Sequence, residues 1–301
     1  MSFFQSSDPR ERRGALRAAL AEPRILRFPG AYSPLVAVLA QELGFDGVYL
    51  GGAMLSSDLA LPDIGLLTLS EVTDRARAVA RATALPLLVD VDTGFGEPLN
   101  AGRTIRELED AGAAGCHLED QRNPKRCGHL DHKELVPVDE MARKVAAAVG
   151  ARRDPNFFVI ARTDARGVEG LDAALERARA YVHAGADVIF PEALADAREW
   201  EAARTALDVP LLANMTEFGR SELLPAARLE ELGVDLVVYP VTTQRLAMGA
   251  VERGLRALRA EGTQAGLLDE MQDRRRLYEL LGYERYAAWD ERVAGWEPPG
   301  A

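Results

Sequence analysis

The feature that most constrains this sequence is a regular succession of short apolar runs, each separated from the next by a segment with helical periodicity. The runs are rich in Val, Ile, Leu, Phe and Tyr, and most are continuous rather than alternating. Continuous runs of this kind are typical of parallel strands that are buried on both faces. The eight runs are residues 25–28, 47–50, 86–91, 115–118, 157–161, 187–190, 210–213 and 235–239.

Between and after the runs lie segments in which apolar residues recur at the spacing of an amphipathic helix. These segments are residues 37–43, 70–83, 101–111, 139–149, 171–184, 199–207, 222–232 and 244–260. Eight strands that alternate with helices predict a TIM-type (β/α)8 barrel, an α/β fold, as one domain over residues 1–301. The alternative is an open doubly wound sheet, which is disfavoured because no Gly-x-Gly-x-x-Gly motif follows the first run.

Helical segments also flank the repeating unit. Residues 1–23 predict an N-terminal amphipathic helix, and residues 263–295 predict a C-terminal helical extension. The extension is rich in Tyr and Trp, so we expect it to pack on the barrel or on a neighbouring subunit. Residues 297–301 are expected to fray.

Composition excludes several classes of function. The 301 residues are 48% hydrophobic and carry a net charge of −11, which argues against nucleic-acid or anionic-membrane partners. No apolar run approaches the ~20 residues of a membrane span, and no secretory signal is recognisable. Two cysteines do not make a disulfide framework, so we expect a cytoplasmic protein.

A polar segment, residues 120–137, interrupts the repeat and contains Lys125, Arg126, Cys127, Gly128 and His129 in succession. Long loops in compact domains are usually functional, and this one has the composition of a loop that closes over a ligand.

Three roles are open for the cysteine of this loop. A zinc site is disfavoured because Cys116, His117, Cys127 and His129 lack zinc-motif spacing. A role as a buried core thiol is disfavoured because Cys127 has no apolar neighbours in the sequence. A reactive thiol or proton donor fits the adjacent cations, although nearby carboxylates oppose a thiolate. Cys116 falls within a strand and is expected to be core.

Acidic residues follow several of the predicted strands. Asp90, Asp92 and Glu119 stand at strand ends, and Asp63 lies in the long segment 51–69. In a barrel the carboxyl ends of the strands form one rim, where crowded carboxylates repel one another unless a cation lies among them. Oxygen ligands suit Mg²⁺, which takes one or two direct carboxylates plus waters. We therefore expect Asp90 and Asp92 to anchor Mg²⁺, with Asp63 and Glu119 acting through water.

Arginines are the candidate partners for a substrate carboxylate. Arg162 ends the fifth strand, and Arg245 and Arg274 lie farther along the chain. Each could make a bidentate contact to a carboxylate.

The Lys-Arg-Cys-Gly-His run, together with motifs spread over nearly the whole chain, resembles the isocitrate lyase and phosphoenolpyruvate mutase superfamily. The motifs are residues 61–63, 88–96, 117–121, 161–165, 190–193 and 214–219. The chain length and residues 216–219 resemble the 2-methylisocitrate lyase branch rather than the longer isocitrate lyases.

This resemblance implies a barrel whose eighth helix is swapped between subunits of a homotetramer, a dimer of swapped dimers. It implies Mg²⁺, with Mn²⁺ as an alternative ion, and retro-aldol cleavage of a tricarboxylate, 2-methylisocitrate, to pyruvate and succinate. The metal ligands carried over are Asp90, Asp92 and Glu119. The catalytic group carried over is Cys127, Lys125, Asp63 and His129. The substrate contacts carried over are Gly51, Gly52, Ala53, Gly128, Arg162, Glu192, Asn214, Met215, Thr216, Arg245 and Arg274.

One departure from the family pattern concerns the end of the second strand. The family usually has Ser-Gly there, whereas this chain has Gly51-Gly52, so a hydroxyl contact is missing. Related cleavage of dimethylmalate, isocitrate or oxaloacetate therefore stays open, as does phosphoenolpyruvate mutase chemistry. A silent barrel used as a scaffold is the non-enzyme alternative, which the intact candidate site disfavours.

Overall fold

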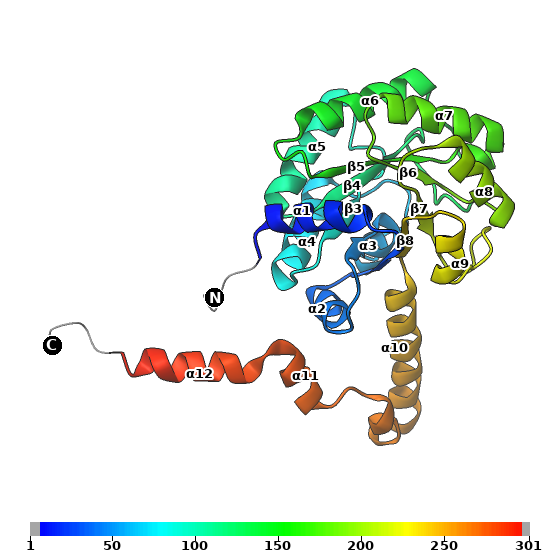
Figure 1. Cartoon of the computed structure of the whole chain (residues 1–301). Coiled ribbons are helices and arrows are strands. Elements are labelled where there is room, and N and C mark those ends of the chain that lie inside the picture. Colours follow the sequence, from blue (N-terminus) through cyan, green and yellow to red (C-terminus); the bar gives the residue numbers. More distant parts are fainter. Residues whose placement is uncertain (1–6, 297–301) are drawn as a thin grey trace. The chain divides into compact units, whose positions relative to one another are not determined.

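The computed structural model describes residues 7–296, and all eight predicted strands are present in it (Figure 1). The strands are β1 (Leu26–Pro29), β2 (Val48–Leu50), β3 (Leu87–Asp90), β4 (Gly115–Glu119), β5 (Phe158–Thr163), β6 (Val188–Pro191), β7 (Leu212–Asn214) and β8 (Leu236–Tyr239). Every strand pairing is parallel, in the orders β2-β3-β4-β5-β6 and β1-β8-β7.

Two parallel bridges join the two groups of strands into a closed barrel. Gly30 pairs with Tyr49 between β1 and β2, and Ile189 pairs with Leu211 between β6 and β7. All eight strands therefore form one ring, and the predicted TIM-type barrel is confirmed. The subunit swap of the eighth helix stays a prediction.

A helix lies in each of the eight segments with helical periodicity. These helices are α2 (Pro34–Glu42), α4 (Leu69–Ala82), α5 (Pro98–Ala111), α6 (Val138–Ala151), α7 (Leu171–His183), α8 (Ala197–Ala206), α9 (Ala226–Glu231) and α10 (Thr242–Glu261). The short α3 (Gly52–Asp58) was not predicted, because seven residues give too little periodicity to detect. None of the helices in residues 7–296 has the length and apolar character of a membrane span.

A glycine with a left-handed backbone conformation lies after four of these helices, at the turn into the next strand. Gly44, Gly112, Gly185 and Gly233 all have positive φ, between 75° and 102°. Glycine adopts this left-handed conformation without the penalty that a Cβ atom brings.

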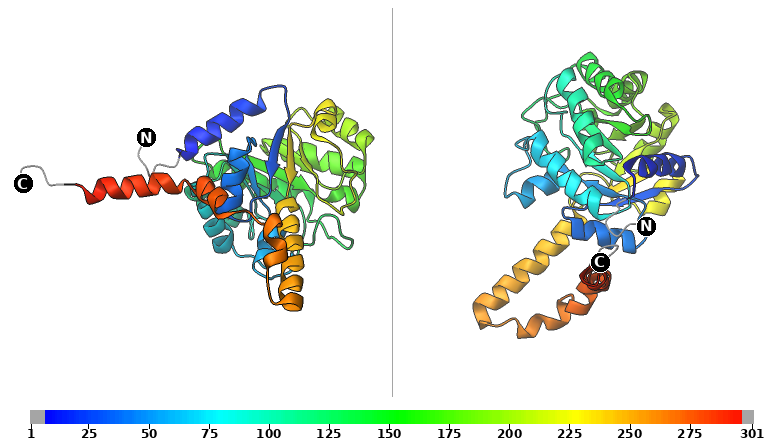
Figure 2. Two further views of the ribbon diagram at one scale, coloured as in Figure 1. Left: turned by 90° about the horizontal axis from the view of Figure 1, so that it is seen from below. Right: turned by 90° about the vertical axis from the view of Figure 1, so that its left-hand side faces the viewer.

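The N-terminal helix α1 (Pro9–Leu20) covers one end of the barrel, as both views in Figure 2 show (blue). Its Leu16 belongs to the cluster of inward-facing side chains that fills the barrel, together with Phe28, Phe158 and Phe190. A second and larger cluster lies between the strands and the outer helices. The opposite end, where the strands terminate, carries the polar candidates.

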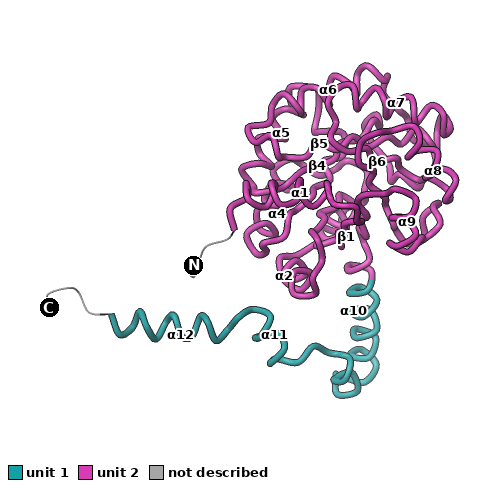
Figure 3. The backbone as a smooth tube through the Cα atoms, viewed as in Figure 1, with its two compact units in different colours: residues 1–5, 246–301 teal, residues 6–245 magenta. Residues whose placement is uncertain are grey.

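The chain divides into two compact units, residues 6–245 and residues 246–301 with 1–5 (Figure 3). Residues 6–245, unit 2 in the figure (magenta), form the barrel. The described part of the other unit contains most of α10, a 3₁₀ segment (Ala265–Glu270), α11 (Arg274–Leu281) and α12 (Tyr283–Ala294). The predicted C-terminal helical extension is thus helical, and residues 297–301 lie outside the described residues.

Candidate active site

The candidate site is built on the carboxyl ends of the strands, where side chains from successive strands converge. Asp90 and Glu119 are the last residues of β3 and β4, and Asn214 is the last of β7. Arg162 lies in β5, and Glu192 directly follows β6. Because all strands are parallel, these side chains share one rim.

The first part of the site is the pair Asp90 and Asp92. The Gly52 and Asp92 N–H groups donate to the two carboxylate oxygens of Asp90, at 2.9 and 3.0 Å. A Cβ atom on Gly52 would lie 3.1 Å from an oxygen of each aspartate, so glycine leaves room for both. Asp92 itself has φ 46°, a strained conformation for a residue with a side chain.

Burial and mutual repulsion separate the pKa values of the two aspartates. Burial alone would raise the pKa of Asp90, but His117, Lys125 and Arg162, with the Gly52 hydrogen bond, lower it to about 2. Burial and then the neighbouring Asp90 charge raise the pKa of Asp92 to about 6, against Lys125. The pair therefore places two carboxylates of different acidity side by side, with Asp90 the stronger acid.

Lys125 from the Cys-containing loop lies over these acids. Its ammonium contacts Asp63 and lies 2.8 Å from Asp92. Burial opposes the charge, but Glu119, Asp92, Asp90 and Asp63 outweigh it and raise the pKa of Lys125. Lys125 is therefore a fixed cation that joins the segment 51–69 to the end of β3.

Arg162 is the centre of a second charge network. Its Nε lies 2.9 Å from Asp164 and 3.2 Å from Glu119, and its Nη1 lies 3.2 Å from Glu192. The guanidinium stacks over Phe190 at 5.1 Å from the ring centroid. One guanidinium is shared among three carboxylates, so burial prevails at Glu119 and raises its pKa.

Glu192 is the most strongly held carboxylate of this network. Burial opposes its ionisation, but Arg162 and His129 lower its pKa below the usual range. His129 Nε2 lies 2.9 Å from Glu192, and Asn214 donates to both carboxylate oxygens at 3.3 Å. His129 Nδ1 accepts the Arg220 N–H at 3.0 Å, which assigns the ring proton to Nε2.

Cys127 is half-buried, and in the sequence it lies between Lys125 and His129. Its neighbour Gly128 lies so close to Arg162 and Glu192 that a Cβ atom would be 2.4 Å from Arg162 Nη2. Burial raises the pKa of the Cys127 thiol, and the His129 N–H and Arg162 offset this only in part. A raised pKa favours the thiol form that a proton donor requires, and the role of Cys127 stays a prediction. Cys116 is fully buried core, as predicted.

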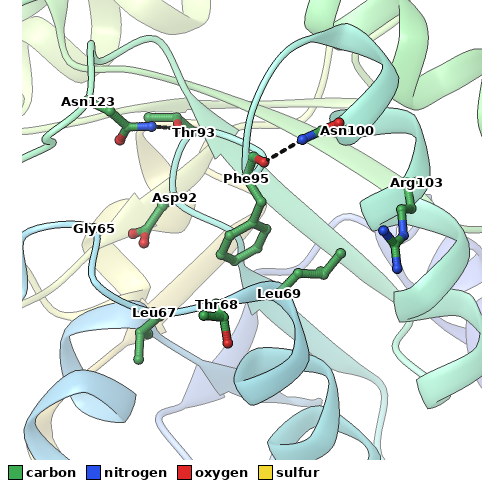
Figure 4. Close-up of a pocket in the computed structure, with 10 residues that line it drawn as sticks. All are labelled: Gly65, Leu67, Thr68, Leu69, Asp92, Thr93, Phe95, Asn100, Arg103 and Asn123. Atoms are coloured by element: carbon green, nitrogen blue, oxygen red, sulfur yellow. Dashed lines mark hydrogen bonds between the residues drawn. The ribbon is translucent and has the colours of Figure 1, made fainter.

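A pocket of about 370 Å³ opens beside Asp92 (Figure 4). Its walls come from the α3–α4 loop, the loop after β3, the start of α5 and the loop after β4. The lining residues are Gly65, Leu67, Thr68, Leu69, Asp92, Thr93, Phe95, Asn100, Arg103 and Asn123. Asp92 thus faces Lys125 and also an open space of a size that holds several waters.

Arg245, Arg274 and three residues at the edge of this cluster are the remaining predicted substrate contacts. Arg245 pairs with Glu217 at 3.0 Å and lies over the Phe218 ring. Arg274 begins α11 in the C-terminal unit, so its predicted contact stays a prediction. The edge residues follow β2 and β7, and they are Ala53, Met215 and Thr216.

Four buried residues of the site were not predicted from the sequence: Tyr49, His117, Lys133 and Asp164. The Tyr49 hydroxyl lies 2.8 Å from His117 Nε2, and the same His117 nitrogen lies 3.7 Å from Asp90 Oδ1. Burial lowers the pKa of His117, and the neighbouring Asp90 charge opposes this. For Tyr49 and His117 the available signal was a polar side chain within an apolar strand, whereas Lys133 and Asp164 lie outside the strands and offered no such signal.

Known proteins share this architecture and sequence. A family model described as phosphoenolpyruvate phosphomutase matches residues 16–259. The chain is 61% identical over 291 residues to a probable 2-methylisocitrate lyase 2 of Corynebacterium glutamicum, covering 97% of this chain and 95% of that protein. The chain belongs to the phosphoenolpyruvate mutase/isocitrate lyase superfamily. The resemblance inferred from the motifs is confirmed.

Further members of the superfamily match over similar lengths. A 2-methylisocitrate lyase of Aeropyrum pernix is 47% identical, covering 97% of this chain and 94% of that protein. Oxaloacetate acetylhydrolase bound to 3,3-difluorooxalacetate has a TM-score of 0.90 at 34% identity, covering 97% and 100% of the two chains. Phosphonopyruvate hydrolase in complex with oxalate and Mg²⁺ has a TM-score of 0.85 at 34% identity, covering 93% and 98%.

Proposed function

We propose that this enzyme is a carbon–carbon lyase that cleaves 2-methylisocitrate to pyruvate and succinate with Mg²⁺. The observation that carries the proposal is the convergence of three groups on one rim: the Asp90–Asp92 pair, the Arg162 network and the half-buried Cys127 thiol. The high identity to relatives named 2-methylisocitrate lyase supports the choice of substrate.

The donors present fit a hard divalent ion. Within the described residues, Asp92 Oδ1 and Glu119 Oε1 are buried oxygens without a hydrogen-bond partner, although Lys125 lies 2.8 Å from the former. No three His, Cys, Asp or Glu side chains of residues 7–296 already converge as a complete ligand set. Mg²⁺ needs no such set, since it keeps several waters and uses one or two carboxylates. Asp90 and Asp92 would hold it, with Glu119 and Asp63 acting through water and Mn²⁺ as a substitute.

When bound, the ion stabilises the carbonyl that develops on the pyruvate half. A base at the rim takes the proton of the 2-hydroxyl, the C2–C3 bond breaks, and the electron pair of this bond stays on C3 of the succinate half. Arg162, already buried and protonated, stabilises the charge that spreads into the adjacent carboxylate. The Cys127 thiol then donates its proton to C3, which completes both products.

Lys125, Asp63 and His129 orient the loop that carries the thiol. Lys125 joins the loop to Asp63 and Asp92, and His129 joins it to Glu192. Both contacts bring the cysteine segment down on the rim and exclude water from the carbanion. Asn214 supports Glu192 from β7, and the backbone of residues 51–53 offers donors to a substrate carboxylate.

The substrate panel separates this proposal from its alternatives. Pyruvate release is measured with Mg²⁺ from 2-methylisocitrate, isocitrate, dimethylmalate and oxaloacetate, and phosphonopyruvate is tested for mutase activity. The expected result is the highest kcat/KM for 2-methylisocitrate. A higher value for dimethylmalate or oxaloacetate would assign the related lyase activity, which Gly51 keeps open. No activity on any of them would favour a scaffold.

The proposal includes a homo-oligomer in which a second copy completes the barrel's outer layer. A groove of about 450 Å³ on the barrel, between α2 and α9, is lined by Leu39, Leu43, Phe45 and Tyr239 among others. The helix α10 carries exposed apolar side chains at helical spacing, namely Met248, Val251, Leu255 and Leu258. Surfaces of both kinds fit a helix supplied by a partner of the same sequence. The cytoplasm remains the expected compartment, and both cysteines are free thiols.

A further inference from the structure

Lys133 is a buried lysine in the loop after β4 to which no role has been assigned so far. Only 2% of its side chain is exposed, and its ammonium lies 3.1 Å from Asp164 Oδ1. The same ammonium also donates to the carbonyl oxygen of Gly128, five residues earlier in the loop. One cation thus joins the turn that follows Cys127 to the residue that follows β5.

The Asp164 end of this contact is anchored independently of Lys133. Asp164 accepts two hydrogen bonds from Arg162, at 2.9 and 3.2 Å, and its own N–H donates to Asp120 at 2.9 Å. Asp164 is fully buried. A lysine that binds such an anchor is held firmly, because a buried ammonium is stable only next to a charge and acceptors.

The other end of the contact, the Lys133 hydrogen bond to Gly128, bears on the position of the Cys127 thiol. Gly128 fits against Arg162 Nη2 and the Glu192 side chain with no room for a Cβ atom. The adjoining turn is closed by the Leu130 N–H, which donates to the Cys127 carbonyl at 2.9 Å. A bond to the Gly128 carbonyl therefore fixes the Gly128–His129 peptide plane, one residue after Cys127, and the approach of this turn to Arg162.

We propose that Lys133 is a positioning residue, whose ammonium locks the Cys127–Gly128 turn onto Asp164 and so holds the thiol over the rim. This rests on the proposed function for the role of Cys127 as proton donor. Lys133 itself touches no reacting atom. Its removal should free the turn, so that the thiol spends less time in the geometry that proton transfer needs.

The test compares Lys133→Met with the native enzyme in two measurements. Methionine keeps the length of the side chain and removes the charge, and Asp164 retains its Arg162 partner, so the barrel is expected to fold. The first measurement is the rate of Cys127 alkylation by iodoacetamide without substrate, which Cys116 cannot obscure because it is fully buried. The second is kcat and KM for cleavage of 2-methylisocitrate.

Alkylation of Lys133→Met should be about fivefold faster or more, because the freed turn exposes the thiol. Loss of a nearby cation alone would act in the opposite sense, since it raises the pKa of the thiol and lowers the thiolate fraction. The value of kcat should fall about 100-fold, with KM changed far less. Lys133→Arg should recover part of both, because a guanidinium can reach the same two oxygens.

The matched control is Arg122→Met, which removes an exposed ion pair with Glu134 in the same loop. Both measurements should stay at native values in this variant. A folded Lys133→Met enzyme with native alkylation and native kcat would overturn the proposal. If the native enzyme cleaves no acid of the panel, the proposed function fails, and the alkylation rates still decide whether Lys133 holds the turn.

Discussion

At the residue scale, the account depends first on Cys127 as a proton donor. The variant Cys127→Ser keeps the shape of the side chain but presents a much weaker acid, so substrate should bind while the carbanion goes unprotonated. We expect kcat to fall about 1,000-fold with KM within about threefold, the range for loss of a general acid. Steady-state kinetics of pyruvate release measure both values. Turnover close to native in the serine variant would refute the proton-donor role.

The protonation state of Cys127 also predicts the alkaline limb of the pH profile. Burial raises the thiol pKa above its ordinary value of ~8.5, with the His129 N–H and Arg162 opposing. The acid form is the active form, so kcat should be level through neutral pH and fall as pH rises through this raised pKa. A rate that instead grows from pH 7 to 9 would indicate a working thiolate. The profile is measured at saturating substrate and metal.

A third prediction at this scale concerns Gly51, the departure from the family pattern. Its backbone conformation is open to any residue, but a Cβ atom would lie 2.8 Å from Tyr49 Cε1. Gly51→Ser should push the Tyr49 ring from its hydrogen bond with His117 and lower kcat/KM about tenfold. The matched control is Gly150→Ser on α6, where a Cβ atom meets nothing within 4 Å. A serine variant at residue 51 with native or higher kcat/KM would show that the ring yields freely.

At the element scale, α1 stabilises the end of the barrel opposite the candidate site. Arg13 donates to the Ala113 and Glu109 carbonyls, at 2.8 and 2.9 Å, and pairs with Asp154 at 3.2 Å, all in buried surroundings. Arg13→Met removes the cation from the buried Asp154 carboxylate and one donor from each of two backbone carbonyls, so the free energy of unfolding should fall by about 3 kcal/mol. Urea denaturation measures this, with the exposed Arg10→Met in the same helix as control. A loss below about 0.5 kcal/mol would show that α1 is dispensable.

The elements themselves were largely predictable from the sequence. Strands and outer helices follow from apolar runs and helical periodicity, and the acids at strand ends follow from the rim that a barrel creates. The contact between Lys133 and Asp164 was not predictable, because it joins a loop without periodicity to another strand. The same holds for Tyr49 and His117, which meet only once β2 and β4 curve around one ring. Sequence motifs predicted the types of reactive group, but the partner of each charged side chain could be identified only in the closed barrel.

At the scale of the whole molecule, the proposed oligomer makes the apolar side chains of α10 part of an interface. Leu255 is 61% exposed in the single chain, and an aspartate there would place a charge in a buried contact between copies. Leu255→Asp should shift the protein from the oligomer to a smaller species in sedimentation equilibrium. Leu99→Asp is the control, since Leu99 is an exposed leucine on α5 of the barrel. Identical masses for the native chain and both variants would contradict this interface.

The central claim is that the acids at the barrel rim work through a divalent ion. The most direct measurement is pyruvate release from 2-methylisocitrate by enzyme stripped with EDTA, followed by titration with Mg²⁺. The account predicts no turnover in the stripped enzyme and full recovery with Mg²⁺, with Mn²⁺ as an effective substitute. Full turnover in excess EDTA would contradict it.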